Sequence, residues 1–133
     1  MSPESRDGHG ASVPLFEQLL ELMRERVRVT IERESPGASG AVVDNLGRRL
    51  DVLDDRIDRI YEQVCASIEG SGLPESERRP LLLNLRLTLL KDERHRVTIE
   101  RDSPSASDGA LHHLGIRLDR LDSEIAQVER QLG

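Results

Sequence analysis

The sequence has few aromatic residues, which make up 2% of its 133 positions: Phe16 and Tyr61, with no tryptophan. Aromatic rings usually supply much of the buried area of a globular core, so leucine, isoleucine and valine must do so here. Long helices packed along seams suit that composition. Because stacking aromatics are scarce and the net charge is −6, we do not expect nucleic acid to be the main partner.

Cysteine and long apolar runs are also scarce. Cys65 is the single cysteine, so the chain cannot form an internal disulfide. There is no signal peptide and no apolar run of about 18 residues, the length that would span a membrane. These absences predict a soluble protein of the reducing cytoplasm with no membrane association. Lysine occurs once against eighteen arginines, a bias that we take as a sign of a bacterial source with GC-rich DNA.

The sequence contains a twelve-residue segment that occurs twice, which we call the repeated phrase. Residues 28–39 read RVTIERESPGAS and residues 96–107 read RVTIERDSPSAS, an offset of 68 (96 minus 28). With the same offset and no gap, residues 15–64 align with 83–132, and 24 of these 50 positions are identical. Such self-similarity predicts an internal duplication, in which each copy has the same local structure.

Each copy carries the spacing of two helices. In its second half, apolar residues are spaced by three and four, which is the heptad seam of a helix. These residues are Val43, Leu46, Leu50, Leu53, Ile57, Ile60 and Val64 in one copy and Leu111, Leu114, Leu118, Leu121, Ile125, Val128 and Leu132 in the other. A preceding helix is expected over 13–34, and its counterpart starts near Pro74 or Pro80.

One stretch of the first helix has a competing interpretation. Val27, Val29 and Ile31 alternate with polar residues, as a short strand would. The period of Leu15, Leu19 and Leu22 runs directly into this stretch, which favours a helix.

A Ser-Pro-x-Ala-Ser break joins the two helices of each copy. Ser35 and Ser103 precede a proline and suit an N-cap with proline at the first helical position, while Ser39 is a second possible cap. Because the break is short, the two helices should lie antiparallel.

These elements predict an all-α fold: an antiparallel, up-down-up-down four-helix bundle built from two tandem, internally duplicated hairpins. We expect a disordered tail over 1–12, the first hairpin over 13–69, a linker over 70–75 and the second hairpin over 76–133. One bundle domain then spans 13–133, with both breaks at the same end.

The first helix of each copy places arginines on its apolar seam. Following the identical positions gives Leu15, Leu19, Leu22, Arg26, Val29 and Arg33, matched by Leu83, Leu87, Leu90, Arg94, Val97 and Arg101. A buried guanidinium is costly unless a carboxylate, a ligand or water satisfies it. Counting from the break places Gly47 opposite Arg26, and Gly115 opposite Arg94. A glycine inside a helix costs about 1 kcal/mol relative to alanine, so these two are expected to make room for the arginine or for its ligand.

Three interpretations of this pattern stay open. In the first, Arg26 and Arg94 pack over the glycines and pair with Glu25, Glu32, Asp51 or their counterparts in a polar layer that fixes the register. In the second, the polar groups shared by both copies form an anion site in each copy, or one shared site, with the helix N-termini. In the third, the same residues form a docking surface at the tips and meet acidic groups of a protein partner. The candidate residues of the anion site are Arg26, Arg33, Arg94, Arg101, Thr30, Thr98, Gly47, Gly115, Ser35 and Ser103.

Several kinds of chemistry have no signature in the sequence. It has no CxxC, P-loop, GxGxxG or Glu-x-x-His motif, and its four histidines do not recur between the copies. We therefore expect no metal, no cofactor and no catalytic residues. The leading hypothesis is a non-enzymatic, regulatory interaction module that docks a protein partner, or a second copy, through helix faces or hairpin tips. The alternatives are a sensor of an anionic, twofold-symmetric ligand and a small helical-bundle enzyme.

Overall fold

The computed structural model describes residues 12–104 and 106–133, and within them the chain is helical and has no strand. The helices are α2 (Ser12–Arg33), α3 (Gly40–Glu69), α4 (Glu75–Arg101) and α5 (Asp108–Leu132). The predicted all-helical class is confirmed, and the stretch 27–31 is helix as preferred. The expected tail falls mostly on residues 1–11, which lie outside the described residues, and Ser12 already begins α2.

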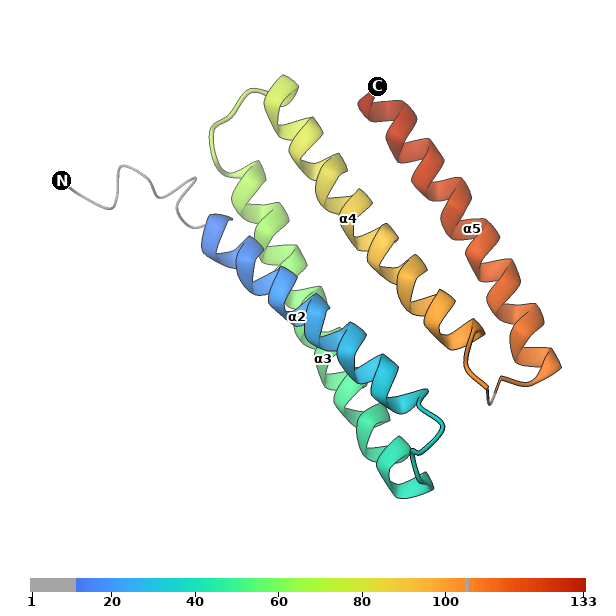
Figure 1. Ribbon diagram of the computed structural model, residues 1–133. Coiled ribbons are helices and arrows are strands. Elements are labelled where there is room, and N and C mark those ends of the chain that lie inside the picture. The colour runs from blue at the N-terminus through green and yellow to red at the C-terminus, as the bar shows by residue number, and fades with distance from the viewer. Residues whose placement is uncertain (1–11, 105) are drawn as a thin grey trace.

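The chain folds back on itself at two tips, which lie at the same end of the molecule (Figure 1). Both tips make the same backbone hydrogen bonds. The amides of Glu34 and Asp102 donate to the carbonyls of Thr30 and Thr98 at 3.0 Å. The amides of Ala38 and Ala106 donate to the carbonyls of Ser35 and Ser103 at 3.1 and 3.2 Å. The repeated phrase therefore encodes a repeated turn.

The helices after the tips begin later than expected. Ser39 and Ser107 are the N-caps, and their hydroxyls accept from the amides of Val42 at 3.5 Å and Ala110 at 3.2 Å. The expectation that Ser35 and Ser103 would cap these helices is wrong. The Ser35 hydroxyl instead donates back to the carbonyl of Ile31 at 2.9 Å, because the preceding helix has only just ended.

We expect Ser107→Ala to lower the free energy of unfolding by about 1 kcal/mol, because it removes a side-chain acceptor for an unpaired helix amide. Ser39→Ala should cost about half as much, since its hydrogen bond is longer. Chemical denaturation of each variant measures both values. A larger loss for Ser35→Ala than for Ser107→Ala would contradict the assignment of the caps.

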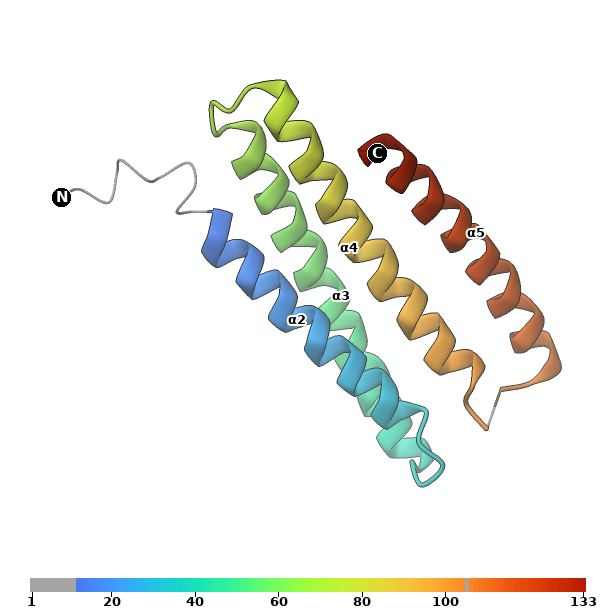
Figure 2. The ribbon, with the colours of Figure 1, turned by 45° about the horizontal axis from the view of Figure 1, so that its top comes forward.

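The four helices do not surround one shared core. In the described part of the chain, α4 contacts α2, α3 and α5, whereas α5 contacts α4 alone. Both ribbon views show α5 on the far side of α4 from the α2–α3 pair (Figures 1 and 2). The closed four-helix bundle expected from the sequence would require α5 to reach the first hairpin, and it does not.

This arrangement follows from two apolar stripes on α4. One stripe, with Leu83, Leu87, Leu90 and Val97, packs with α5. The other packs on the first hairpin and contains Leu82, Leu85 and Leu89. The positions of α2 that correspond to this second stripe are Pro14, Glu17 and Glu21, all exposed. Because α4 has this second apolar stripe, it lies between the α2–α3 pair and α5, and α5 lies at the edge.

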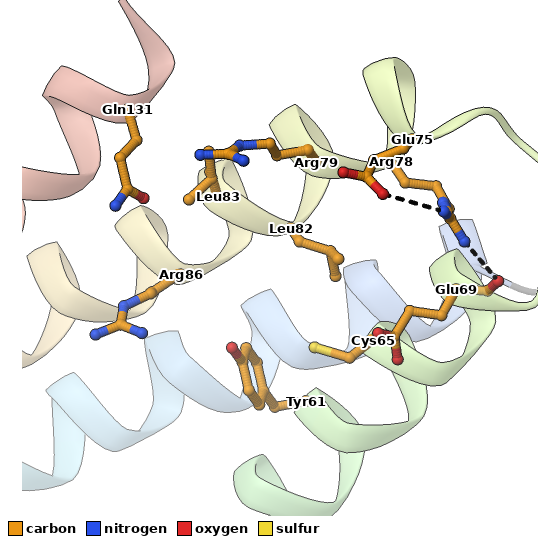
Figure 3. Close-up of a pocket in the computed structure, with 10 residues that line it drawn as sticks. All are labelled: Tyr61, Cys65, Glu69, Glu75, Arg78, Arg79, Leu82, Leu83, Arg86 and Gln131. Carbon is orange, nitrogen blue, oxygen red and sulfur yellow. Dashed lines mark hydrogen bonds and ion pairs between the residues drawn. The ribbon is translucent and has the colours of Figure 1, made fainter.

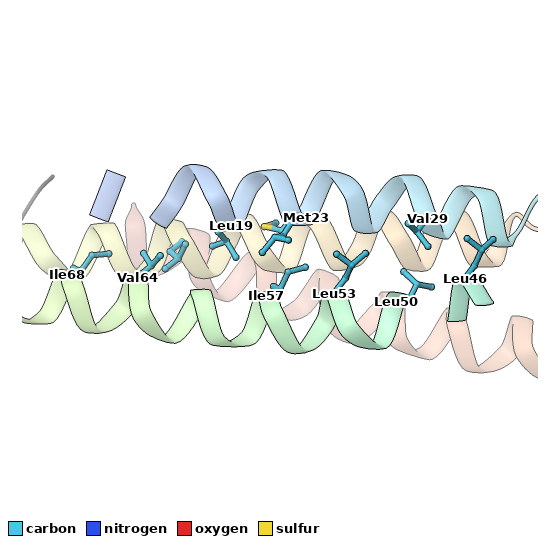
Figure 4. Close-up of a cluster of buried hydrophobic side chains, with 11 residues drawn as sticks. Leu19, Met23, Val29, Leu46, Leu50, Leu53, Ile57, Val64 and Ile68 are labelled. Carbon is cyan, nitrogen blue, oxygen red and sulfur yellow. The ribbon is translucent and has the colours of Figure 1, made fainter. Parts of the chain in front are cut away.

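The buried side chains accordingly form two clusters. The larger lies between α2, α3 and α4 and includes Leu19, Met23, Val29, Leu53 and Ile57 (Figure 4). The smaller lies between α4 and α5, and its buried members are Leu90, Val97, Leu118, Leu121 and Val128. The second hairpin is therefore packed on one side only.

The connection between the hairpins runs from Gly70 to Pro74, which caps α4. Pro80 lies inside α4, beyond its first turn, where its ring nitrogen cannot donate to the carbonyl four residues earlier. The helix nevertheless continues through it. None of the helices in the described ranges is long and apolar enough to cross a membrane.

Candidate functional site

Arg26 lies in a buried ion-pair layer formed by three helices. Its side chain in α2 is 7% exposed. Its Nη1 donates to Asp54 Oδ1 of α3 at 2.8 Å, and its Nη2 donates to Asp92 Oδ2 of α4 at 2.8 Å. Its Nε has no hydrogen-bond partner among the described residues. Two carboxylates therefore balance this guanidinium, and they belong to Asp54 and Asp92 rather than to the expected Glu25, Glu32 or Asp51.

Arg96 extends the same layer. It lies one turn beyond Asp92 on α4, and its Nε is 3.4 Å from Asp92 Oδ2. Burial, together with the nearby charge of Arg26, holds the pKa of the Arg96 guanidinium below its ordinary value. Asp92 thus lies between two buried arginines, and its own side chain is only 13% exposed. This arrangement ties α4 to the first hairpin.

Arg94 occupies the equivalent position in the second hairpin but a different environment. It pairs with Asp122, the counterpart of Asp54, through its Nε. Its side chain is 47% exposed, because no third helix covers it. Two residues along α4 differ in direction by about 200°, so Arg94 faces α5 while Asp92 faces Arg26. The two seam arginines therefore do not form one shared anion site.

The remaining candidate residues are mostly engaged within their own helices. The hydroxyls of Thr30 and Thr98 donate to the carbonyls of Arg26 and Arg94 at 2.8 and 2.9 Å. Arg33 pairs with Glu34 at 3.1 Å and lies 3.7 Å from Glu100 of α4. Such contacts satisfy these groups without a ligand.

The counterpart of Arg33 is more open. Among the described residues, the ion pair of Arg101 is with the adjacent Asp102, at 3.4 Å. Ser103 is buried at the second tip, and Ser35 is exposed at the first. The structure therefore gathers the candidate residues into two separate groups, one per hairpin.

Gly47 and Gly115 do not make room for the arginines. A Cβ atom added to either glycine would meet no atom within 4 Å. The expectation that Gly47 makes room for the Arg26 side chain is therefore wrong. Helix α3 simply has open space at this level, so the glycine gives no evidence of a close contact.

Gly115 does line a surface hollow, which we call the tip groove. Its volume is ≈ 480 Å³, and it lies between the C-terminal half of α4 and the N-terminal half of α5. It brings together three of the predicted residues with apolar and acidic neighbours: Arg94, Arg101, Gly115, Leu111, His112, Ile116, Leu118, Asp119 and Asp122.

Sequence reasoning missed Asp92 and Arg96. Their counterparts are Arg24 and Arg28, so a comparison restricted to identical positions discards Asp92; it keeps Arg96, but that residue lies off the seam traced through Leu90, Arg94 and Val97. A signal was present, because Leu82, Leu85, Leu89, Asp92 and Arg96 are spaced by three and four along α4. That second seam predicts a partner for a face of α4 that the first seam does not use.

Across the described residues, no group of three or more histidine, cysteine or acidic side chains is placed to hold a metal ion. Comparison with known proteins adds no further guidance: no protein-family model, curated protein or solved structure matches the chain.

Proposed function

We propose that this chain is a non-enzymatic helical interaction module that binds a helix of a partner protein in the tip groove. The observation that carries the proposal is the difference between two equivalent arginines. In the first hairpin, α4 covers Arg26 and supplies Asp92 as its second carboxylate. In the second hairpin, Arg94 has one carboxylate, and no helix of the described chain covers it.

The first hairpin shows what kind of helix such a groove takes. The helix α4 presents leucines and one carboxylate on the same stripe, and the carboxylate meets the seam arginine. The tip groove offers complementary chemistry, since Leu111 and Ile116 are 39% and 47% exposed beside Arg94 and Arg101. An amphipathic helix with an acidic residue among apolar ones would cover both features.

Other sequence differences between the two copies limit the docking surface to the half of the second hairpin that is nearer its tip. Towards the linker, Lys91 replaces Met23 and Thr88 replaces Leu20. These polar side chains suit solvent, whereas their counterparts pack in or against the first core. The partner helix is therefore expected to cross the hairpin near Arg94 and Ile116 and not to follow its whole length.

Head-to-tail binding of a second copy does not suit the groove. In such an array, α2 of the next copy would take the place that α4 takes on the first hairpin. The exposed face of α2 carries Glu17, Glu21 and Arg24 where α4 carries Leu85, Leu89 and Asp92. Because α2 has no apolar stripe there, the proposal assigns the groove to another protein.

The duplication belongs to the same proposal. The matched sequence, the shared turn hydrogen bonds and the equivalent pairs Arg26–Asp54 and Arg94–Asp122 support an origin of both hairpins from one. The alternative of a sensor that binds through the duplicated arginines is less favoured, because two carboxylates already engage Arg26.

A photo-crosslinking side chain at position 116 tests the proposal, with position 52 on α3 as the control. Val52 is similarly exposed but lies outside the tip groove. We expect a cross-link from position 116 to a helical, acidic segment of another protein, and none from position 52. Equal labelling from both positions, or a cross-link only to a second copy of this chain, would overturn the proposal.

The affinity of the identified partner gives a second measure. Ile116→Glu places a charge on the exposed apolar side chain and opposes an acidic helix, so we expect at least a tenfold loss, about 1.4 kcal/mol. Val52→Glu should leave the affinity unchanged. Circular dichroism melts check that both variants stay folded. Undiminished binding by Ile116→Glu would show that the partner docks elsewhere.

A further inference from the structure

A second hollow lies at the opposite end of the molecule from the tips, and we call it the linker-end pocket. Its volume is ≈ 530 Å³, within the range of small-molecule sites, and its lining comes from α3, α4 and α5 (Figure 3). It exists because α5 packs on α4 without reaching α3, which leaves a trough over α4. It shares no residue with the tip groove.

The pocket has an apolar side. Leu82 of α4 lines it together with the ring of Tyr61 and the side chain of Cys65 from α3, whereas Leu83 lies beside Arg79 (Figure 3). Burial raises the pKa of the Tyr61 hydroxyl and that of the Cys65 thiol, so both groups are neutral at pH 7. This side therefore offers apolar surface and a neutral hydroxyl, and it places no negative charge against a ligand.

The pocket also has a cationic side. Arg79 and Arg86 are one heptad apart on α4 and lie towards Gln131 of α5 in Figure 3, on the other side from Leu82 and Cys65. The side chain of Arg79 has no ion pair or hydrogen bond within the described ranges. The ion pair of Arg86 among these residues is with Glu124, at 3.5 Å, and both side chains are partly exposed.

The charges of the lining are not balanced. Three arginines, Arg78, Arg79 and Arg86, face two glutamates, Glu69 and Glu75, in a chain whose net charge is −6. Arg78 uses its guanidinium within the pocket wall, 3.9 Å from Glu75 and 3.5 Å from the carbonyl of Glu69. Arg79 is therefore without a carboxylate partner in the lining, and Arg86 has a single, partly exposed contact with Glu124 that an anion can displace.

We infer that the linker-end pocket binds an amphipathic anion. The carboxylate or phosphate head is held by Arg79 and Arg86, and the apolar body lies over Leu82, Tyr61 and Cys65. Guanidinium groups pair well with either head. A neighbouring hollow of ≈ 280 Å³ shares Tyr61 and Arg86 with this pocket and is lined further by Ile57 and Leu89, so the apolar surface continues along α4.

Isothermal titration calorimetry of the full chain with decanoate and with decyl phosphate, below their micelle concentrations, tests the inference. We expect decanoate, decyl phosphate or both to bind. The compound with the higher affinity identifies whether the pocket prefers a carboxylate or a phosphate head group. Decyltrimethylammonium, of equal chain length and opposite charge, should not bind. Equal binding of this cation would show unspecific adsorption to apolar surface and would overturn the inference.

The double variant Arg79→Gln, Arg86→Gln should lose at least about tenfold in affinity, because it removes both charge-assisted contacts to the head group. A matched control is Arg59→Gln, Arg120→Gln, which removes two exposed arginines that do not line the pocket. Undiminished binding by the Arg79 and Arg86 variant, or an equal loss in the control, would contradict the assigned site.

The position of the ligand can be read from two residues that occur once in the chain. Cys65 is the single cysteine and Tyr61 the single tyrosine, and both line the pocket. We expect bound decanoate or decyl phosphate to slow alkylation of Cys65 and to change the fluorescence of Tyr61 at the same concentration. Binding heat with an unchanged alkylation rate would place the ligand elsewhere. Ile116→Glu should leave all of these readouts unchanged, so the pocket and the tip groove are tested independently.

Discussion

Replacing Arg26 by methionine is expected to lower the free energy of unfolding by about 2–4 kcal/mol, because it leaves a buried carboxylate without its principal partner. Asp92 loses the most stabilisation, because its side chain is 13% exposed and Arg96 is the arginine that remains near it. Asp54 is half exposed and can turn to water. Chemical denaturation, with the slope of the transition compared between variants, measures the change.

Arg94→Met is the matched control, because it removes the same side chain from the same position of the second hairpin. Its pair with Asp122 is about half exposed on both sides, so we expect a loss of at most about 1 kcal/mol. A double-mutant cycle between Arg26 and Asp92 should give a coupling of at least about 1 kcal/mol. Equal losses for Arg26→Met and Arg94→Met would contradict the buried layer.

Gly47→Ala and Gly115→Ala are expected to stabilise the protein by about 1 kcal/mol each, and by about 2 kcal/mol together, because alanine favours the helix interior. The structure supports this sign, since an added Cβ meets no atom within 4 Å at either position. The sequence alone predicts the opposite sign at Gly47, on the assumption that Arg26 fills the space. Thermal and chemical denaturation of the two single variants and the double variant measure the effect.

Gly72→Ala serves as the contrasting control. Its φ of 82° lies in the left-handed region, so a side chain strains the connection between the hairpins and should destabilise it. A destabilising effect of Gly47→Ala would contradict this expectation, because it would mean that other atoms fill the space beside Gly47 in solution.

The helices and their pairing could be predicted because local spacing determines them. Leucine and isoleucine at intervals of three and four fix the buried face of α3 and of α5, and the repeated phrase fixes both turns. The position of α5 could not be obtained in the same way. Assuming that both copies behave alike hides the one difference that decides the arrangement, which is the second apolar stripe of α4.

The same assumption explains the outcome for the candidate site. Arg26 and Arg94 occupy equivalent positions just before the repeated phrase, yet one is buried and the other is half exposed. The difference comes from Asp92, a position where the copies differ, and from the helix that carries it. The burial of a residue depends on which helix covers it. Sequence identity between the two copies does not tell which helix that is.

The edge position of α5 also determines how the molecule can open. Releasing α5 breaks contacts with one helix, whereas releasing α4 breaks contacts with three. Segments held by few neighbours open with a smaller free energy than the whole fold, and they do so as units. Detachment of α5 at the second tip is therefore the sub-global opening of lowest cost. It would bare the Leu83, Leu87 and Leu90 stripe while the ion-pair layer of Arg26 stays closed.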